Sequence, residues 1–206
     1  DSNSSMFAGE LHLSRPLWKG QISLGTECSN TKREERFINI EHVLADNLPL
    51  IKENNTAVYV ELMQRLGKIT FQLGGRYEHV NSNYYQNKQK VNDQSRTYDK
   101  LFPTALLTMP IGKGMIQLSY AKKYNRPLYS QLSGTVSYVN RYLYQSGDPL
   151  LRASYIDNIS LNTRYSWAML MINYLHTTDK IMTLAVDYNQ DNATLFKKAN
   201  STYNLD

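Results

Sequence analysis

The chain has 206 residues, of which 41% are hydrophobic, and it carries a formal net charge of +5. Its mean hydropathy of -0.52 excludes a helical membrane protein, because no run of about 18 apolar residues could span a bilayer as a helix. A transmembrane barrel stays compatible, since every second residue of its strands faces a polar lumen. Lys and Arg are scattered through Tyr- and Asn-rich segments with no long basic run, so we expect no nucleic-acid partner.

Tyrosine is the most unusual part of the composition, with 16 Tyr against 5 Phe and 2 Trp. A Tyr side chain suits a place with one wet side and one apolar side, such as the aromatic girdle of a membrane barrel or a sugar-binding surface. The composition favours the barrel and leaves the binding surface open. The single Cys, Cys28, excludes a disulfide within the chain and a zinc site built on several thiolates.

The first quarter of the chain shows the alternation of apolar and polar residues that is typical of β-strands. One predicted strand contains Leu11 and Leu13 on a shared face, and the next runs through 18–24. The stretch 28–55 is charged and irregular, and it predicts a long exposed loop with a helical turn within 41–48.

The clearest local signal is a hairpin around a tight turn at 66–68. Before the turn, Val58, Val60 and Leu62 share one face of a predicted strand. After the turn, the same alternation gives the apolar set Ile69, Phe71, Leu73, Gly75 and Tyr77. A strand from about residue 69 to 80, at about 3.3 Å per residue, is long enough to cross a bilayer core when tilted. Strands of soluble proteins usually run about 5 or 6 residues, so the length favours a membrane barrel.

The rest of the chain repeats the pattern of long strands, tight turns and long polar connections. Further strands are predicted at 101–109, 116–120, 159–167, 168–174 and 182–188, for a total of roughly nine. Tight turns are predicted at 111–114, 166–168 and 177–180, and the long connections are 28–55, 81–98 and 124–155. We therefore predict an all-β fold, an antiparallel meander of long strands forming a segment of a transmembrane β-barrel. Because outer-membrane barrels have short periplasmic turns and long outer loops, the turns at 66–68, 111–114 and 166–168 are predicted to face the periplasm.

Four segments resemble the outer-membrane β-barrel region of TonB-dependent receptors from Bacteroidetes. They are ENNTAVYVELMQRLGKITFQLGGRYEH, YDKLFPTALLTMPIGKGMIQLSYAKKYNRPLYSQL, YLYQSGDPLLRASYIDNISLNTRYSW and YLHTTDKIMTL. The resembling features are the LFP strand start, QLSY followed by NRP, and QSGDPLL in the long loop. The resemblance covers residues 55 to 190 well and the first 50 weakly.

The resemblance implies a bacterial outer-membrane receptor or transporter for energy-coupled uptake of a scarce nutrient, such as a metal chelate, a vitamin or a glycan. In the family a plug domain precedes the barrel and contacts a periplasmic energy-coupling protein. Bacterial barrels also close with an even number of strands and leave no open edge in lipid. We therefore expect residues 1–206 to be a partial barrel domain, an excised fragment without its plug domain and closing strands. Alone in water, such a fragment is expected to self-associate or curl its sheet, because lipid no longer covers its apolar face.

The long connection from 124 to 155 is the best candidate for contact with a ligand. It offers flat rings and cationic guanidinium groups, which suit an anionic chelate or a sugar ring. The predicted ligand-binding residues are Tyr124, Arg126, Tyr129, Tyr138, Arg141, Tyr142 and Tyr144. The open alternative is a loop that folds over its own neighbours and packs these tyrosines there.

The sequence predicts no enzyme, cofactor or metal site. The four histidines at 12, 42, 79 and 176 lack metal-ligand spacing. Ser119 with His176, or Asp187 with His79, could form catalytic pairs, but no sequence feature selects them. The leading alternative function is a soluble all-β domain that binds a ligand through a Tyr-rich surface. In that case the apolar strand faces would meet across a core, whereas in a barrel they point outward.

Overall fold

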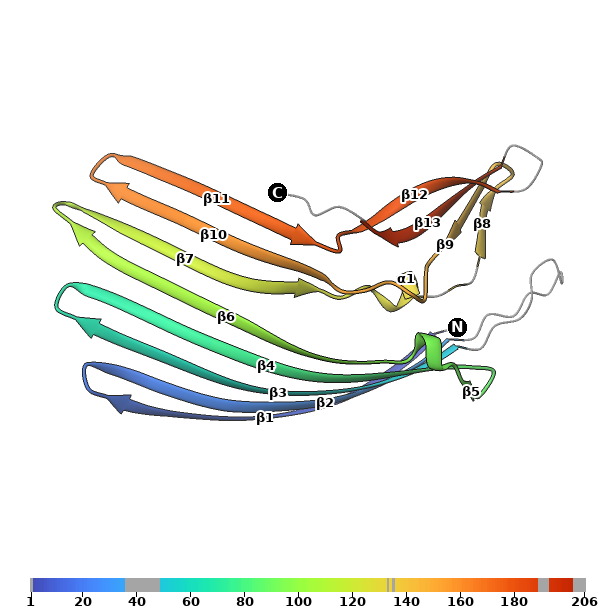
Figure 1. The fold of residues 1–206 in the computed structure, drawn as a ribbon, viewed down its shortest axis with the longest axis horizontal. Helices are drawn as coiled ribbons and strands as arrows, with labels where there is room; N and C mark the ends of the chain where they lie inside the picture. Colours follow the sequence, from blue (N-terminus) through green and yellow to red (C-terminus); the bar gives the residue numbers. More distant parts are fainter. Residues whose placement is uncertain (1, 36–48, 133, 135, 189–192, 202–206) are drawn as a thin grey trace.

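The alternating segments fold into long antiparallel strands in a computed structural model, which describes residues 2–35, 49–132, 134, 136–188 and 193–201. The predicted helical turn within 41–48 lies outside the described residues. The main sheet has the strand order β1-β2-β3-β4-β6-β7-β10-β11, with each neighbouring pair antiparallel (Figure 1). Its strands are β1 (Ser2–Leu17), β2 (Gly20–Glu35), β3 (Pro49–Leu66), β4 (Ile69–Gln86), β6 (Arg96–Ile111), β7 (Gly114–Asn125), β10 (Ser154–Tyr165) and β11 (Ala168–Thr178). The predicted all-β antiparallel meander is confirmed.

The long connections contain more ordered structure than the sequence predicted. The short strand β5 (Gln89–Lys90) pairs with the end of β4, and the 3-10 turn η1 (Asn92–Gln94) follows it. Between β7 and β10 lie the one-turn helix α1 (Tyr129–Leu132) and the strands β8 (Val136–Asn140) and β9 (Leu143–Ser146). The prediction of roughly nine strands was therefore too low, since thirteen are present in the described ranges alone. The additional strands β5, β8, β9 and β13 are only two to eight residues long, so they carry little of the alternation that marks a long strand.

Two predicted loops are largely strand. Pairing of β2 with β3 continues through Thr31 opposite Glu53, deep in the stretch 28–55 that was predicted as a loop. Similarly, β4 runs on to Gln86 and pairs with β6 as far as Arg96. Backbone hydrogen bonds between strands form whatever the polarity of the side chains, so polar residues extend these strands beyond their apolar portions.

Strands β12 (Ile181–Tyr188) and β13 (Ala193–Asn200) leave the main sheet. They join β9 and β8 in a second sheet of order β12-β13-β9-β8, in which β13 and β9 run parallel. The predicted turn at 177–180 is present, but β12 pairs with β13 and does not return along β11. Side-chain contacts hold the chain at this bend: Arg152 Nη2 lies 2.5 Å from Asp179 Oδ1, and Asn200 Nδ2 donates to the Asp179 carbonyl at 2.7 Å.

The register of the main sheet places the predicted apolar residues on one face. Val58 lies opposite Tyr77, and Leu62 lies opposite Leu73. Residues directly opposite each other in an antiparallel pair point to the same side. In the described part of the chain nothing covers this face: Leu73 is 51% exposed. No described helix combines the length and hydropathy needed to cross a membrane.

Tight turns join the strand pairs at one end of the main sheet, at the left of Figure 1. Their central residues are Trp18-Lys19, Gly67-Lys68, Gly112-Lys113 and Ser166-Trp167. The first residue of each turn has a positive φ, between 47° and 60°. Glycine adopts this conformation without strain, which accounts for Gly67 and Gly112. The turns predicted at 66–68, 111–114 and 166–168 are thus confirmed, although Trp167 lies in the turn and not in the preceding strand.

Candidate ligand pocket on the polar face

The face opposite the apolar one carries a network of ion pairs centred on Glu78. Arg76 bridges two strands, with its Nε 2.6 Å from Glu78 Oε1 and its Nη2 2.8 Å from Glu27 Oε2. Arg126 reaches the second oxygen of Glu78 at 3.2 Å and also contacts Glu53 at 2.7 Å. Glu78 is only 3% exposed. A buried carboxylate is stable when charged partners and hydrogen bonds surround it, as they do here.

The strand register explains how these side chains meet. Ala57 on β3 lies between Glu27 on β2 and Glu78 on β4, directly opposite both. Because the Ala57 side chain is a single methyl group, the longer neighbours close over it and leave it 1% exposed. Arg76 therefore spans β3 and pairs with carboxylates on both flanking strands.

A second bridge across the sheet depends on a glycine. Tyr59 lies over Gly25, where a Cβ would come within 2.2 Å of a Tyr59 ring carbon. This close approach lets the Tyr59 hydroxyl donate to Glu10 Oε1 at 2.7 Å and lie 3.0 Å from His12 Nδ1. Strands β1 and β3 are thereby linked across the intervening strand β2.

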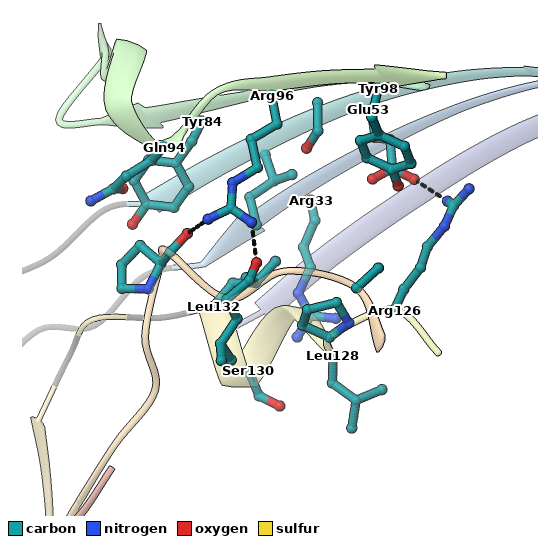
Figure 2. A pocket seen from close by; sticks show the side chains of 16 residues that line it. Arg33, Glu53, Tyr84, Gln94, Arg96, Tyr98, Arg126, Leu128, Ser130 and Leu132 are labelled. Atoms are coloured by element: carbon teal, nitrogen blue, oxygen red, sulfur yellow. Dashed lines mark hydrogen bonds and ion pairs between the residues drawn. The ribbon is translucent and has the colours of Figure 1, made fainter. Parts of the chain in front are cut away.

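A pocket of about 350 Å³ adjoins the network on its loop side. Three arginines from different parts of the chain line it: Arg33 from β2, Arg96 from β6 and Arg126 from the segment after β7. Figure 2 shows Arg126 extended toward Glu53. The remaining walls are mainly apolar or uncharged: Ile51, Ser82, Tyr84, Gln94, Tyr98, Pro127, Leu128, Ser130, Leu132, Pro149, Leu151 and Ala153.

Arg96 connects the sheet to the loop segment that covers this pocket. Its guanidinium donates to the Leu151 carbonyl and, at 3.0 Å, to the Pro149 carbonyl (Figure 2). The backbone N–H of Asp148 donates to the Gln131 carbonyl at 2.7 Å, which joins this segment to α1. Leu151 is 2% exposed as a result. Residues 126–132 and 148–153 thus form a single cover over the polar face.

The pocket has a net positive charge. Its three arginines and one carboxylate, Glu53, leave a formal charge of 3 − 1 = +2 among its lining residues. Burial disfavours the charged form of Arg126, but the acidic groups around it outweigh this effect and raise its pKa. The Nε atom of Arg126 is buried and has no hydrogen-bond partner among the described residues. An anionic ligand that enters the pocket could accept a hydrogen bond from this Nε–H group.

The predicted ligand-binding residues divide into two groups. Arg126 lines the pocket, and the Tyr124 hydroxyl donates to Glu78 at 2.9 Å while its ring contacts Phe102. Tyr129 begins α1, and its side chain lies outside the described part of the structure.

The other four predicted residues lie on or between β8 and β9, away from the pocket lining. Tyr144 packs against Tyr138 and Tyr188, with ring centroids 5.7 and 4.6 Å apart, and Arg141 lies over the Tyr142 ring. The structure therefore does not bring the seven predicted residues into one site.

Sequence reasoning missed the sheet residues of the pocket and the network. Arg33 and Arg96 fall in the stretches 28–55 and 81–98, which are predicted as loops but form strand at these two residues. Glu27, Arg76 and Glu78 occupy alternate positions on the face opposite the apolar residues. Charge confined to one face of a long strand was the signal that could have identified them.

Neither catalytic pair considered from the sequence is formed. Ser119 lies opposite Ser160, whereas His176 lies opposite Asp157, so the two belong to opposite faces of the sheet. His79 Nδ1 lies 2.7 Å from Asp99. Within the described ranges, no group of three or more His, Cys, Asp and Glu residues could hold a metal ion.

A single curved layer of long strands with an exposed apolar face and a charged face is the wall of a transmembrane β-barrel. Residues 1–205 match the model of the outer membrane protein beta-barrel family, and the chain belongs to that family. The protein is therefore located in the outer membrane. The comparison with curated proteins gave no match.

Several solved structures share this fold. The ferric yersiniabactin uptake receptor FyuA from Yersinia pestis has a TM-score of 0.62 at 16% identity, over 88% of this chain and 30% of the receptor. The FrpB iron transporter from Neisseria meningitidis has a TM-score of 0.58 at 14% identity, over 97% of this chain and 31% of the transporter. The ferric enterobactin receptor PfeA from Pseudomonas aeruginosa was solved as a mutant with enterobactin bound. Its TM-score is 0.57 at 17% identity, over 97% of this chain and 31% of the receptor. The chain thus spans about a third of the length of these proteins.

Proposed function

We propose that the chain forms part of the barrel wall of an outer-membrane receptor of the TonB-dependent kind, and that its polar face binds an anionic metal chelate. The observation that carries this proposal is the pocket lined by Arg33, Arg96 and Arg126. Guanidinium groups bind carboxylate and other oxyanion ligands through paired, charge-assisted hydrogen bonds.

The position of the pocket supports a role in uptake. It lies on the polar face, which is the lumen side if the apolar face contacts lipid, and toward the end of the sheet opposite the tight turns. With short turns in the periplasm, a ligand arriving from outside would meet this pocket before passing deeper into the barrel. Energy would reach the receptor through a periplasmic coupling protein and a plug domain, as in the TonB-dependent receptors that the sequence resembles.

Among the nutrients considered, an anionic chelate fits better than a vitamin or a glycan. The pocket combines a formal charge of +2 with apolar walls such as Ile51 and Leu151. Three similar structures are described as receptors or transporters of ferric yersiniabactin, iron or enterobactin, in agreement with this choice. A soluble all-β domain is disfavoured because Leu73 and Leu118, on the apolar face, are 51% and 44% exposed.

The test is a binding measurement on the full-length parent protein with the variant Arg33→Gln. Arg33 is chosen because it lines the pocket from β2, whereas Arg96 and Arg126 contact the pocket cover and Glu78. Loss of one charge-assisted hydrogen bond should weaken binding of a ferric siderophore about tenfold or more, as followed by isothermal titration calorimetry. Arg164→Gln, an exposed arginine near the tight turns, is the matched control. Equal affinity of wild type and Arg33→Gln for ferric siderophores, or preferential binding of a neutral glycan, would refute the proposed ligand class.

A further inference from the structure

The end of the main sheet that carries the tight turns has a one-sided charge. Six basic residues lie in or near the four turns: Arg15, Lys19, Arg65, Lys68, Lys113 and Arg164. No Asp or Glu occurs in residues 11–26, 62–77, 100–147 or 158–178, which include all four turns and the strand portions beside them. Glu61 lies five residues before the end of β3, and acidic residues such as Glu27, Glu53 and Glu78 lie farther from the turns. We call the turn residues 18–19, 67–68, 112–113 and 166–167 the turn rim.

Lysine recurs at one position of this rim. Lys19, Lys68 and Lys113 are each the second central residue of a two-residue turn, and all three are exposed. The turns follow one another at every second strand of the sheet, so neighbouring lysines are offset by about 10 Å along its edge. The positive charges therefore form a row and not a single cluster.

The two tryptophans of the chain lie in the same rim. Trp18 and Trp167 are 89% and 91% exposed, more than any other large hydrophobic side chain in the described residues. An indole ring favours the boundary between hydrocarbon and water, where its apolar body and its polar N–H are both accommodated.

The rim also continues directly into the exposed apolar face. Leu66 and Ile69 flank the turn at Gly67-Lys68, and Ile111 precedes the turn at Gly112-Lys113; all three are exposed. When lipid covers the apolar face, the lysines just beyond it lie at the depth of the lipid headgroups.

We propose that the turn rim binds the phosphates of anionic phospholipids in the periplasmic leaflet of the outer membrane. The row of lysines supplies the charge, and Trp18 and Trp167 set the depth of the barrel in the leaflet. A row of separate cations along the barrel edge suits an array of headgroups, each contacting one lysine, better than it suits one compact anion. The choice of leaflet rests on the proposed orientation, in which tight turns face the periplasm.

The test uses the full-length parent protein in vesicles of phosphatidylcholine, with spin-labelled phosphatidylglycerol or phosphatidylcholine as the probe. Electron spin resonance gives the selectivity of the protein for the anionic lipid over the zwitterionic one. The triple variant Lys19→Gln, Lys68→Gln, Lys113→Gln should lower this selectivity at least about fivefold, the effect of one cation near an anionic surface. The triple variant Lys88→Gln, Lys90→Gln, Lys123→Gln removes equal charge from exposed positions nearer the opposite end and should leave the selectivity unchanged.

A charge-preserving variant with arginine at positions 19, 68 and 113 separates charge from turn geometry and should retain the selectivity. An equal loss in the arginine and glutamine variants, or unchanged selectivity in the glutamine variant, would overturn the proposal. Lysine-dependent selectivity for lipopolysaccharide over phosphatidylglycerol would place the rim in the outer leaflet and overturn it as well. Siderophore binding by these variants reports separately on the proposed uptake function, because none of the three lysines lines the arginine pocket.

Discussion

Arg126 and Glu53, which are 73 residues apart in the chain, form an ion pair with a distance of 2.7 Å between Nη1 and Oε1. Glu53 belongs to β3, whereas Arg126 begins the segment that follows β7. This ion pair joins the pocket cover to the centre of the sheet, and it belongs to the same network as Glu78.

Replacing Arg126 with Ala should destabilise the barrel by about 1 to 3 kcal/mol, because it removes charged partners from Glu53 and the buried Glu78. The cost stays moderate since Glu78 keeps Arg76 and Tyr124. The free energy of unfolding in urea, measured on the protein reconstituted in lipid, checks this value. Arg141→Ala serves as the control, because Arg141 is exposed and outside the network. An equal effect of the two substitutions would show that the network contributes little.

Gly25→Ala should destabilise the protein by about 1 to 3 kcal/mol, because the new methyl group meets the Tyr59 ring and displaces its hydroxyl from Glu10. Gly9→Ala is a close control, since a Cβ at Gly9 of the neighbouring strand meets nothing within 4 Å. Thermal unfolding of both variants gives the comparison. If the clash is the cause, the effect of Gly25→Ala should largely disappear in a Tyr59→Ala background.

Leu73→Arg or Leu118→Arg should each lower the free energy of folding into lipid vesicles by about 2 to 4 kcal/mol, as expected for a cation facing the middle of the bilayer. Both leucines lie on the exposed apolar face. Gln72→Arg and Gln117→Arg introduce the same charge one residue away, on the polar face, and should be tolerated. Similar costs on both faces would contradict the assignment of the lipid side.

The chain expressed alone in water should self-associate, because the apolar face of its main sheet stays exposed without lipid. Light scattering on the refolded chain should show species larger than one chain. Replacing Leu73, Leu107 and Leu118 with Gln should shift the distribution toward monomer. A wild-type chain that is strictly monomeric with these leucines exposed would contradict the prediction.

Much of the architecture could be predicted from local patterns in the sequence. The alternation of Val58, Val60 and Leu62 specifies which side of β3 is apolar, because side chains of a strand point to opposite faces with a period of two. Gly67 and Gly112 mark two of the tight turns, because a left-handed backbone conformation there favours glycine. These features depend on residues close together in the chain, so they can be recognised without knowing the fold.

The lengths of the strands and the composition of the pocket were decided by the tertiary structure. Thr31 lies opposite Glu53 in the β2–β3 ladder, whose backbone hydrogen bonds leave no signal in polar side chains. The parallel pairing of β13 with β9 left no local signal either, since it joins segments about 50 residues apart. Arg33, Arg96 and Arg126 meet only because β2 and β6 lie on either side of β3 and β4 and the segment after β7 folds back over them. The two-residue alternation of strands and the residues that form tight turns are local properties of the chain. A charged site depends instead on the strand order, which brings distant residues to one face of the sheet.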